Sequence, residues 1–340
     1  GADATSIAVR MSRAITKRDH IAFCGYHGWH DWFVGTTDLN AGIPKFNEQL
    51  AHSFSYNDID SLERIFKKYK NKIACVIMEP ITVAGPKSGI NGSTKWKDFN
   101  SKKNFLIDVK KICRKNGALL VFDEVVTGFR YDMGGAQKMF NIIPDLSCFA
   151  KAMSNGIPVS AITGKKEYMK FLETTFFSFT YGGDCVGLAA AKACINKLDK
   201  KNVIDHLYKV GKRLKDGMNE LINLYELDEI LECSGYPCRT VMTIKNYKKY
   251  KKPLIIKSLI QQELMIKGVL WSQYHSISFS HKNSHIDHTL NAFEDSFKKL
   301  KKIIENNKTV ENYLYGKPCQ TVFTRVADFQ SVATSQKIRN

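Results

Sequence analysis

Two short apolar runs, each ending in an ionisable residue, constrain the fold of this chain more than any other feature. Residues 118–122 are all apolar and lead directly into Asp123 and Glu124. A second, mainly apolar run at residues 146–150 leads into Lys151. Buried parallel strands read as continuous apolar runs, and sheets of this kind bind ligands at the carboxyl ends of their strands. The pattern therefore predicts a carboxylate and an amine at one ligand-binding edge of a parallel sheet.

This pair of groups suits Schiff-base chemistry. A lysine in a low-dielectric cleft loses its proton more easily and becomes a nucleophile toward carbonyl groups. A carboxylate nearby can keep a pyridinium nitrogen protonated, which makes pyridoxal phosphate (PLP) an electron sink. Taken singly, Asp123 and Glu124 could equally be a solvated strand end. Lys151 could be a surface lysine, because the chain has 51 Lys and Arg residues.

The order of residues around these groups carries a specific resemblance. The segment from Phe122 to Arg130, followed by Pro144 to Leu146 and then by Lys151, resembles the cofactor core of class III PLP-dependent aminotransferases. The branch that contains glutamate-1-semialdehyde aminomutase is the most similar. The resemblance covers nearly the whole chain. It implies an α/β protein of PLP-transferase fold type I, with a mostly parallel doubly wound sheet and a smaller α+β C-terminal domain.

The order of predicted elements favours the same fold. Strands are predicted at residues 21–23, 73–78, 118–122 and 146–150, and helices at residues 57–69 and 105–113. Strands that alternate with helices are typical of a doubly wound parallel sheet. We predict a large PLP-binding domain over residues 1–201, a C-terminal small domain over residues 202–307 and a C-terminal tail over residues 308–340.

The resemblance implies roles for the residues around the cofactor ring. Lys151 would bind PLP covalently and would move a proton as general base and acid. Asp123 would pair with the ring nitrogen. Tyr26, which lies in a glycine-flanked turn, and Val125 would sandwich the ring. Glu79, which ends a predicted strand just before Pro80, would lie beside the substrate.

The resemblance also implies a phosphate site and a second subunit. Gly1 and Ala2 begin a helical pattern, and the first backbone N–H groups of a helix bind anions. In the family this turn holds the PLP phosphate, and Thr180 would reach the phosphate of the neighbouring subunit. The expected active unit is therefore a homodimer. Members of the family carry an N-terminal arm before this motif, and the expectation is a fold with that arm missing.

Two reactions share this machinery. An aminotransferase moves an amino group from a small-molecule amino donor to an oxo substrate. The residues around Thr180 resemble sequences from surface-polysaccharide pathways, and this resemblance favours an aminotransferase with an oxo-sugar of surface-polysaccharide synthesis as the acceptor. The alternative is a glutamate-1-semialdehyde 2,1-aminomutase, which keeps the amino group within one molecule. A non-catalytic relative of these enzymes is a third possibility.

A cysteine hydrolase is an alternative from another class. Residues 183–187 imitate a nucleophile elbow with Cys185 in place of serine. Such an elbow needs a strand directly before the nucleophile and a histidine base. Residues 176–180 would have to form that strand, and His206 or His275 would have to supply the base.

Composition narrows the remaining classes. The net charge is +18, but the lysine run at residues 298–302 falls on the polar face of a predicted helix, so no nucleic-acid partner is expected. His27, His30 and Asp31 are closely spaced, but the sequence indicates no further ligand, so no metal is expected. The sequence shows no membrane span, no leader and no paired cysteine motif among nine cysteines, which favours a cytoplasmic enzyme without membrane partners.

Overall fold

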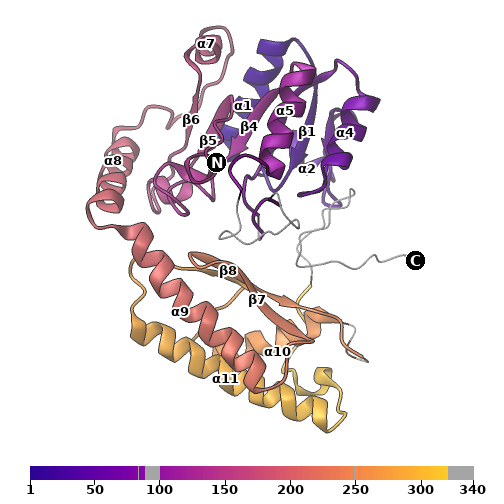
Figure 1. The fold of residues 1–340 in the computed structure, drawn as a ribbon, viewed down its shortest axis with the longest axis vertical. Coiled ribbons are helices and arrows are strands. Elements are labelled where there is room, and N and C mark those ends of the chain that lie inside the picture. Colours follow the sequence, from indigo (N-terminus) through magenta and orange to yellow (C-terminus); the bar gives the residue numbers. More distant parts are fainter. Residues whose placement is uncertain (83, 89–99, 249, 251, 321–340) are drawn as a thin grey trace. The chain divides into compact units, whose positions relative to one another are not determined.

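The computed structural model describes residues 1–340 except residues 83, 89–99, 249, 251 and 321–340. The described chain divides into two compact units (Figure 1). The first runs from Gly1 to Ile204, and the second begins at Asp205. None of the nine cysteines, all of which lie in the described ranges, forms a disulfide bond. No helix within the described ranges is both long and apolar enough to span a bilayer.

The first unit is built on a six-stranded sheet with the order β2-β1-β3-β4-β5-β6. The strands are β1 (His20–Cys24), β2 (Ala51–Ser53), β3 (Ile73–Met78), β4 (Leu119–Asp123), β5 (Leu146–Phe149) and β6 (Ala161–Gly164). All neighbouring pairs are parallel except β5 and β6, which are antiparallel. In the register of β4 and β5, Asp123 lies opposite Cys148, so these two strands end at the same edge.

Helices cover both faces of this sheet. On one face, α1 (Ala2–Thr16) packs into a core cluster that includes Phe23, Ile77 and Val121. The alternate strand residues, such as Val76 and Leu120, point to the opposite face and are also buried. There α5 (Phe105–Asn116) lies against β4, and α4 (Ile59–Lys68) lies beside α5. The predicted doubly wound, mostly parallel sheet is confirmed (Figure 1).

Side-chain caps fix where these helices begin. The Asp58 carboxylate accepts the Ser61 N–H at 3.1 Å before α4, and the Asn104 side chain accepts the Ile107 N–H at 3.1 Å before α5. Such caps satisfy backbone N–H groups that have no acceptor inside the helix. The other helical segments of this unit are α2 (Asp31–Val34), α3 (Phe46–Leu50), α6 (Gly135–Met139), η3 (Lys151–Met153), α7 (Lys166–Met169), η4 (Lys170–Glu173) and α8 (Cys185–Lys200).

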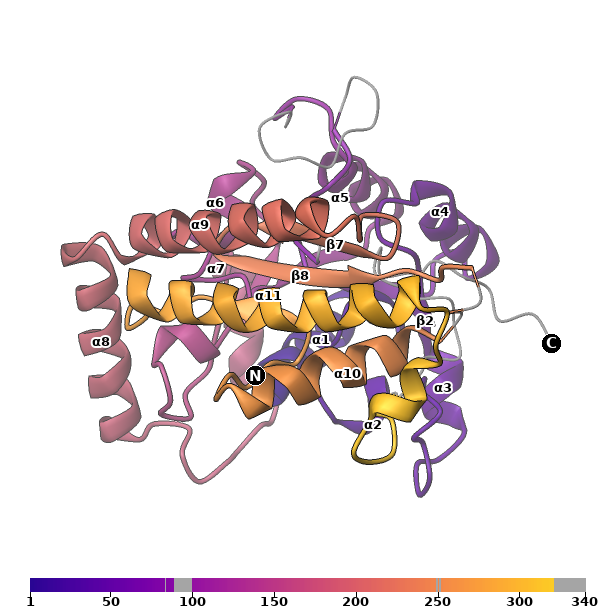
Figure 2. The same ribbon diagram turned by 90° about the horizontal axis from the view of Figure 1, so that it is seen from below.

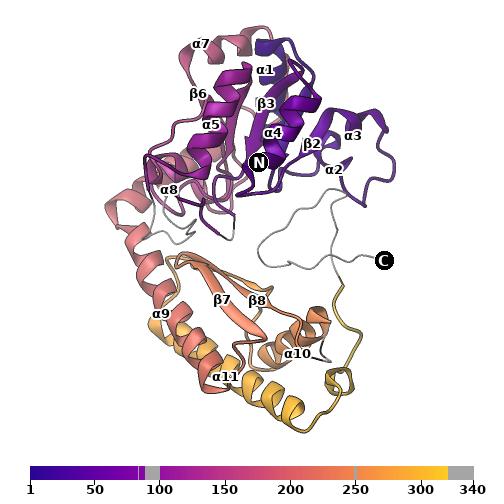
Figure 3. The same cartoon turned by 45° about the vertical axis from the view of Figure 1, so that its right-hand side comes forward.

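The second unit is a smaller α+β domain, as predicted. Its elements are α9 (Val203–Leu224), β7 (Leu231–Tyr236), β8 (Arg239–Ile244), α10 (Pro253–Ile266), β9 (Tyr274–Ser276), α11 (Asn283–Glu305) and η5 (Val310–Tyr313). The strands form an antiparallel sheet of order β7-β8-β9. The helices α9 and α11 run side by side along this sheet (Figures 2 and 3).

Two glycines let α9 pack closely in this unit. A Cβ at Gly217 would lie 2.6 Å from the Leu290 Cδ1 atom of α11. A Cβ at Gly211 would lie only 1.9 Å from the Pro237 carbonyl oxygen, in the turn between β7 and β8. The residues that follow α11 are held along α10, where Gln262 Nε2 donates to the Tyr313 carbonyl oxygen at 3.0 Å.

Candidate active site

A cavity of about 650 Å³ lies at the carboxyl edge of the six-stranded sheet. It is lined by residues that directly follow β1, β3, β4 and β5, because parallel pairing brings these strand ends together. Seven residues predicted for the site line it, namely Gly1, Ala2, Tyr26, Glu79, Asp123, Val125 and Lys151. Thr180 is exposed and is not among the described residues that line the cavity.

Asp123 is buried and its carboxylate is fixed by two donors. Its Oδ1 accepts the Val125 N–H at 3.1 Å, and its Oδ2 lies 2.8 Å from His27 Nδ1. An ionised carboxylate only accepts hydrogen bonds, so His27 Nδ1 carries the proton. His27 is itself buried, and its Nε2 atom has no hydrogen-bond partner among the described residues. This contact of His27 was not predicted from the sequence, although His27 directly follows Tyr26 in the same turn.

The turn that carries Tyr26 is bonded to Glu79. The Glu79 Oε2 atom accepts the Tyr26 N–H at 3.1 Å. Gly25 has φ +122°, and a Cβ there would lie 2.7 Å from the same oxygen, so glycine is required for this approach. The Tyr26 ring is 47% exposed and meets Phe33 edge to face at 5.5 Å. Tyr26 also lines the cavity.

The same turn also approaches the N-terminus of α1. Gly28 has φ +106°, and a Cβ there would lie 2.5 Å from the Ala2 Cβ atom. The Thr5 hydroxyl donates to the His27 carbonyl oxygen at 2.7 Å. The first backbone N–H groups of α1 therefore lie at the cavity, where a helix N-terminus favours an anion such as a phosphate.

Lys151 begins the turn η3, which is separated from β5 by Ala150. Its φ is +44°, in the left-handed region that is costly for residues other than glycine. The Lys151 carbonyl oxygen accepts the Asn155 N–H at 2.9 Å, which closes the turn. Lys151 is exposed in the single chain and lines the cavity.

The Glu124 side chain points away from the cavity, although Glu124 is adjacent to Asp123 in the chain. Its carboxylate accepts the Ala136 N–H at 2.8 Å, the Gln137 N–H at 2.9 Å and the Thr127 hydroxyl. Burial raises the pKa of the Glu124 carboxyl, and these three hydrogen bonds oppose that rise. Glu124 therefore holds the loop before α6 in place.

The geometry is wrong for a cysteine hydrolase. Residues 176–184 form turns and coil, so no strand leads into Cys185, which is exposed at the start of α8. The two candidate bases are engaged elsewhere: His206 Nε2 bonds to the His281 carbonyl oxygen at 3.0 Å, and His275 bonds to Thr240 and Trp271.

A histidine-based metal site is also unsupported by the geometry. His27 bonds to Asp123, whereas His30 Nδ1 bonds to the Ser6 hydroxyl at 2.5 Å. The described part of the chain contains no group of three His, Cys, Asp or Glu side chains placed to hold a metal ion.

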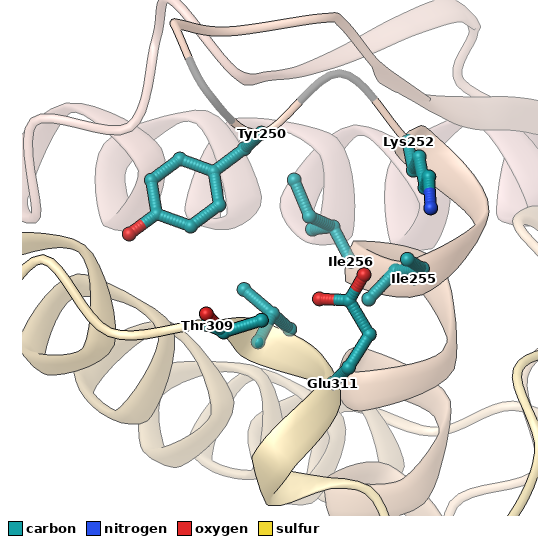
Figure 4. Close-up of a pocket in the computed structure, with 7 residues that line it drawn as sticks. Tyr250, Lys252, Ile255, Ile256, Thr309 and Glu311 are labelled. Atoms are coloured by element: carbon teal, nitrogen blue, oxygen red, sulfur yellow. The ribbon is translucent and has the colours of Figure 1, made fainter.

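A second, smaller cavity of about 240 Å³ lies in the C-terminal unit (Figure 4). It is lined by Tyr250, Lys252, Ile255, Ile256, Thr309, Val310 and Glu311. It contains none of the residues predicted for the active site.

The family model for class III aminotransferases matches residues 1–304. The chain belongs to the class III aminotransferase family. The 3-aminobutyryl-CoA aminotransferase of Cloacimonas acidaminovorans is 33% identical over 309 residues, which cover 89% of this chain and 70% of that protein. The glutamate-1-semialdehyde 2,1-aminomutase of Clostridium beijerinckii is 34% identical over 319 residues, which cover 87% of this chain and 72% of that protein.

Solved transaminases share the fold of this class III aminotransferase. The FumI protein of Sphingopyxis sp. MTA144, solved in a PLP form, has a TM-score of 0.78 at 24% identity and covers 92% of this chain and 72% of its own. An omega-transaminase of Sphaerobacter thermophilus has a TM-score of 0.73 at 22% identity and covers 88% of this chain and 72% of its own. The predicted PLP-transferase fold type I is confirmed.

Enzymes of this family use PLP, so this class III aminotransferase is a PLP-dependent enzyme. The cavity fits that cofactor. Its volume lies within the roughly 300–1,000 Å³ of small-molecule sites. A buried carboxylate, a primary amine, an aromatic side chain and a helix N-terminus all border it. These groups are the complements of a pyridinium nitrogen, an aldehyde, a flat ring and a phosphate.

Proposed function

We propose that this enzyme transfers an amino group from a small-molecule amino donor to an oxo substrate, with PLP bound between Lys151 and Asp123. The observation that carries this proposal is that both residues line one cavity, with the Asp123 carboxylate buried and held by His27 and Val125. A buried carboxylate held in one orientation is a strong partner for a cation.

The chain's own groups have distinct roles in this proposal. PLP, when bound, supplies an electron sink that stabilises negative charge at the substrate carbon next to nitrogen. The Lys151 Nζ atom holds the cofactor and, once released, takes up and returns a proton. The Asp123 carboxylate holds a proton on the ring nitrogen. Tyr26 and Val125 flank the ring and exclude water from its faces.

The phosphate would be held by the backbone N–H groups at Gly1 and Ala2. Thr180 of the partner subunit would complete this site in a homodimer. Two observations support a second copy. Thr180 does not line the cavity of its own chain, and the apolar helix α8 buries only Gly187 and Ala191. Phe176 and Phe179 are also exposed, a few positions before α8 in the chain, and exposed apolar surface is typical of an interface.

The mouth of the cavity favours a hydroxylated oxo substrate such as an oxo-sugar. Trp29 is 73% exposed and Tyr181 is 70% exposed, although both line the cavity. Aromatic faces pack against the C–H faces of a sugar ring, and the carboxylates of Asp3 and Glu79 can accept its hydroxyl groups. Lys151 is the only lysine or arginine among the described residues that line the cavity, so little here attracts a dicarboxylate.

An aminomutase acting on glutamate 1-semialdehyde is the second candidate. The 34% identity to the aminomutase of Clostridium beijerinckii over most of the chain favours it. Both reactions need the same cofactor groups, so the cofactor side of the cavity does not separate them.

A visible absorption band tests the cofactor site. Purified protein incubated with PLP should show a band that resists dialysis, and Lys151→Ala should lose it. Lys166→Ala, which removes an exposed lysine of α7, is the matched control and should keep it. A band that survives in Lys151→Ala would refute the assignment of Lys151.

Substrate exchange separates the two reactions. Transfer of ¹⁵N from an amino donor to an added oxo-sugar supports the aminotransferase. Conversion of glutamate 1-semialdehyde without any second substrate supports the aminomutase and contradicts our proposal.

A further inference from the structure

A chain of contacts extends from Asp123 to the first turns of α1. His27, which bonds to Asp123, stacks on the Trp32 ring at a centroid distance of 6.0 Å and an interplanar angle of 17°. The Trp32 Nε1–H donates to the Ser6 hydroxyl at 2.9 Å. Asp123 and His27 are almost fully buried, whereas Trp32 and Ser6 are half-buried.

The chemistry of these groups fixes the direction of each hydrogen bond. The indole N–H only donates, so the Ser6 oxygen accepts from Trp32. The single Ser6 hydroxyl hydrogen then points to His30 Nδ1, 2.5 Å away. His30 Nε2 in turn faces the Asp3 carboxylate at 3.4 Å. Trp32 is therefore held at its nitrogen by a hydroxyl that His30 and Asp3 orient.

The His27 ring depends on its neighbours because it has few polar contacts. Its Nδ1–H is used by Asp123, and its Nε2 atom has no hydrogen-bond partner among the described residues. Packing against Trp32 and Phe33 must therefore set the plane of the ring. A rotation of that plane would swing the Nδ1–H away from the carboxylate.

We propose that Trp32, held by Ser6, is a positioning residue that orients His27 and thereby the Asp123 carboxylate toward the cofactor ring. This inference rests on the proposed function of Asp123. Neither Trp32 nor Ser6 lines the cavity, so both act through His27. A group that is held by packed and hydrogen-bonded neighbours keeps its productive geometry without help from the ligand.

The test uses Ser6→Ala and Trp32→Phe, since both remove the same hydrogen bond and Trp32→Phe keeps an aromatic ring against His27. The first readout is the proton NMR signal of the His27 Nδ1–H in protein without PLP, assigned by its loss in Asp123→Asn. The second is the dissociation constant of PLP. Thr16→Ala, which removes another hydroxyl from the same helix, is the control.

We expect both variants to broaden or shift the His27 signal and to weaken PLP binding roughly two- to tenfold, the range for one hydrogen bond. The double variant should be about as weak as the weaker single variant, because the two changes remove one shared interaction. Thr16→Ala should leave both readouts unchanged.

Variants that are less stable to urea but keep the wild-type His27 signal and PLP affinity would overturn the inference, since they would show a structural contribution only. Failure of the wild-type protein to bind PLP would instead refute the proposed function. In that case the His27 signal in the free protein would still decide whether Ser6 and Trp32 orient this ring.

Discussion

Asp123 and Glu124 are adjacent in the chain, yet their carboxylates serve different purposes. Successive side chains of a strand end point in opposite directions, so Asp123 faces the cavity and Glu124 faces the loop before α6. The Asp123 carboxylate accepts hydrogen bonds from one histidine and one backbone N–H, and it can also bind a cofactor at the cavity. Glu124 is fully used by the Ala136 and Gln137 N–H groups and the Thr127 hydroxyl.

Removal of the Glu124 carboxylate should therefore lower the free energy of unfolding. Glu124→Ala leaves the buried Ala136 N–H without its acceptor and frees the Gln137 N–H, at a cost of roughly 3 kcal/mol in the free energy of unfolding. Glu124→Gln keeps one acceptor oxygen and should cost less. Urea unfolding measures both, and a near-neutral Glu124→Ala would show that water replaces the carboxylate.

His275 makes stability depend on pH. The indole N–H of Trp271 donates to His275 Nε2 at 2.9 Å, so the proton is on Nδ1, which lies 2.9 Å from the Thr240 hydroxyl. Burial lowers the pKa of His275 from 6.5 to about 4. As the pH falls, this histidine binds a proton in the unfolded chain before it does so in the folded chain. The contribution of neutral His275 to the free energy of unfolding is therefore complete above pH 6.5 and is lost as the pH falls toward about 4.

The free energy of unfolding should drop by about 2 kcal/mol between about pH 7.5 and about pH 5 through this group. His275→Gln does not titrate, so its urea unfolding should show a smaller drop over the same range. Equal pH slopes in the two proteins would mean that His275 titrates normally in the folded state.

At the scale of elements, glycines decide how closely α9 packs. Gly211 and Gly217 both lie in the interior of this helix, where glycine is less favourable than alanine by about 1 kcal/mol. They differ in what an added methyl group would meet. At Gly217 it meets the end of the Leu290 side chain, which can move, whereas at Gly211 it meets the backbone oxygen of Pro237.

Gly211→Ala should therefore destabilise the protein by about 2 kcal/mol or more, and Gly217→Ala should be close to neutral because the gain in helix propensity offsets the crowding. Thermal or urea unfolding of the two variants side by side measures this difference. Similar losses at the two positions would contradict the explanation from backbone contact.

At the scale of the whole molecule, the proposed homodimer predicts complementation between two defective chains. Lys151→Ala lacks the amine but retains Thr180, and Thr180→Ala has the opposite defect. If Thr180 acts on the partner's phosphate site, hybrid dimers contain one intact site, so about a quarter of all sites should be restored after statistical mixing.

The measurement is the absorption of bound PLP at a cofactor concentration that leaves Thr180→Ala largely unloaded. Mixing after mild dissociation and reassembly should raise the signal above the average of the two separate proteins. If Thr180 acts within its own chain, mixing should leave the absorption of bound PLP at the average of the two separate proteins.

The sequence by itself determined four of the six strands of the sheet, namely β1, β3, β4 and β5, and the edge at which they end. Ile73–Met78 was predicted as a strand with the observed bounds, because a continuous apolar run bounded by polar residues is typical of a buried parallel strand. The positions of Asp123 and Lys151 at one edge followed from the same pattern, since parallel strands end together. The family followed from the motif around them.

Only the tertiary structure decided which groups surround Asp123. His27 precedes Asp123 by 96 positions, and the Trp32–Ser6 hydrogen bond joins residues 26 positions apart, so neither contact leaves a local pattern. A cysteine hydrolase would need a strand before Cys185, but residues 176–179 form coil, where Phe176 and Phe179 are exposed and Phe177 is half-buried. Local periodicity reports which side of an element is buried, whereas a site depends on contacts between elements that only packing brings together.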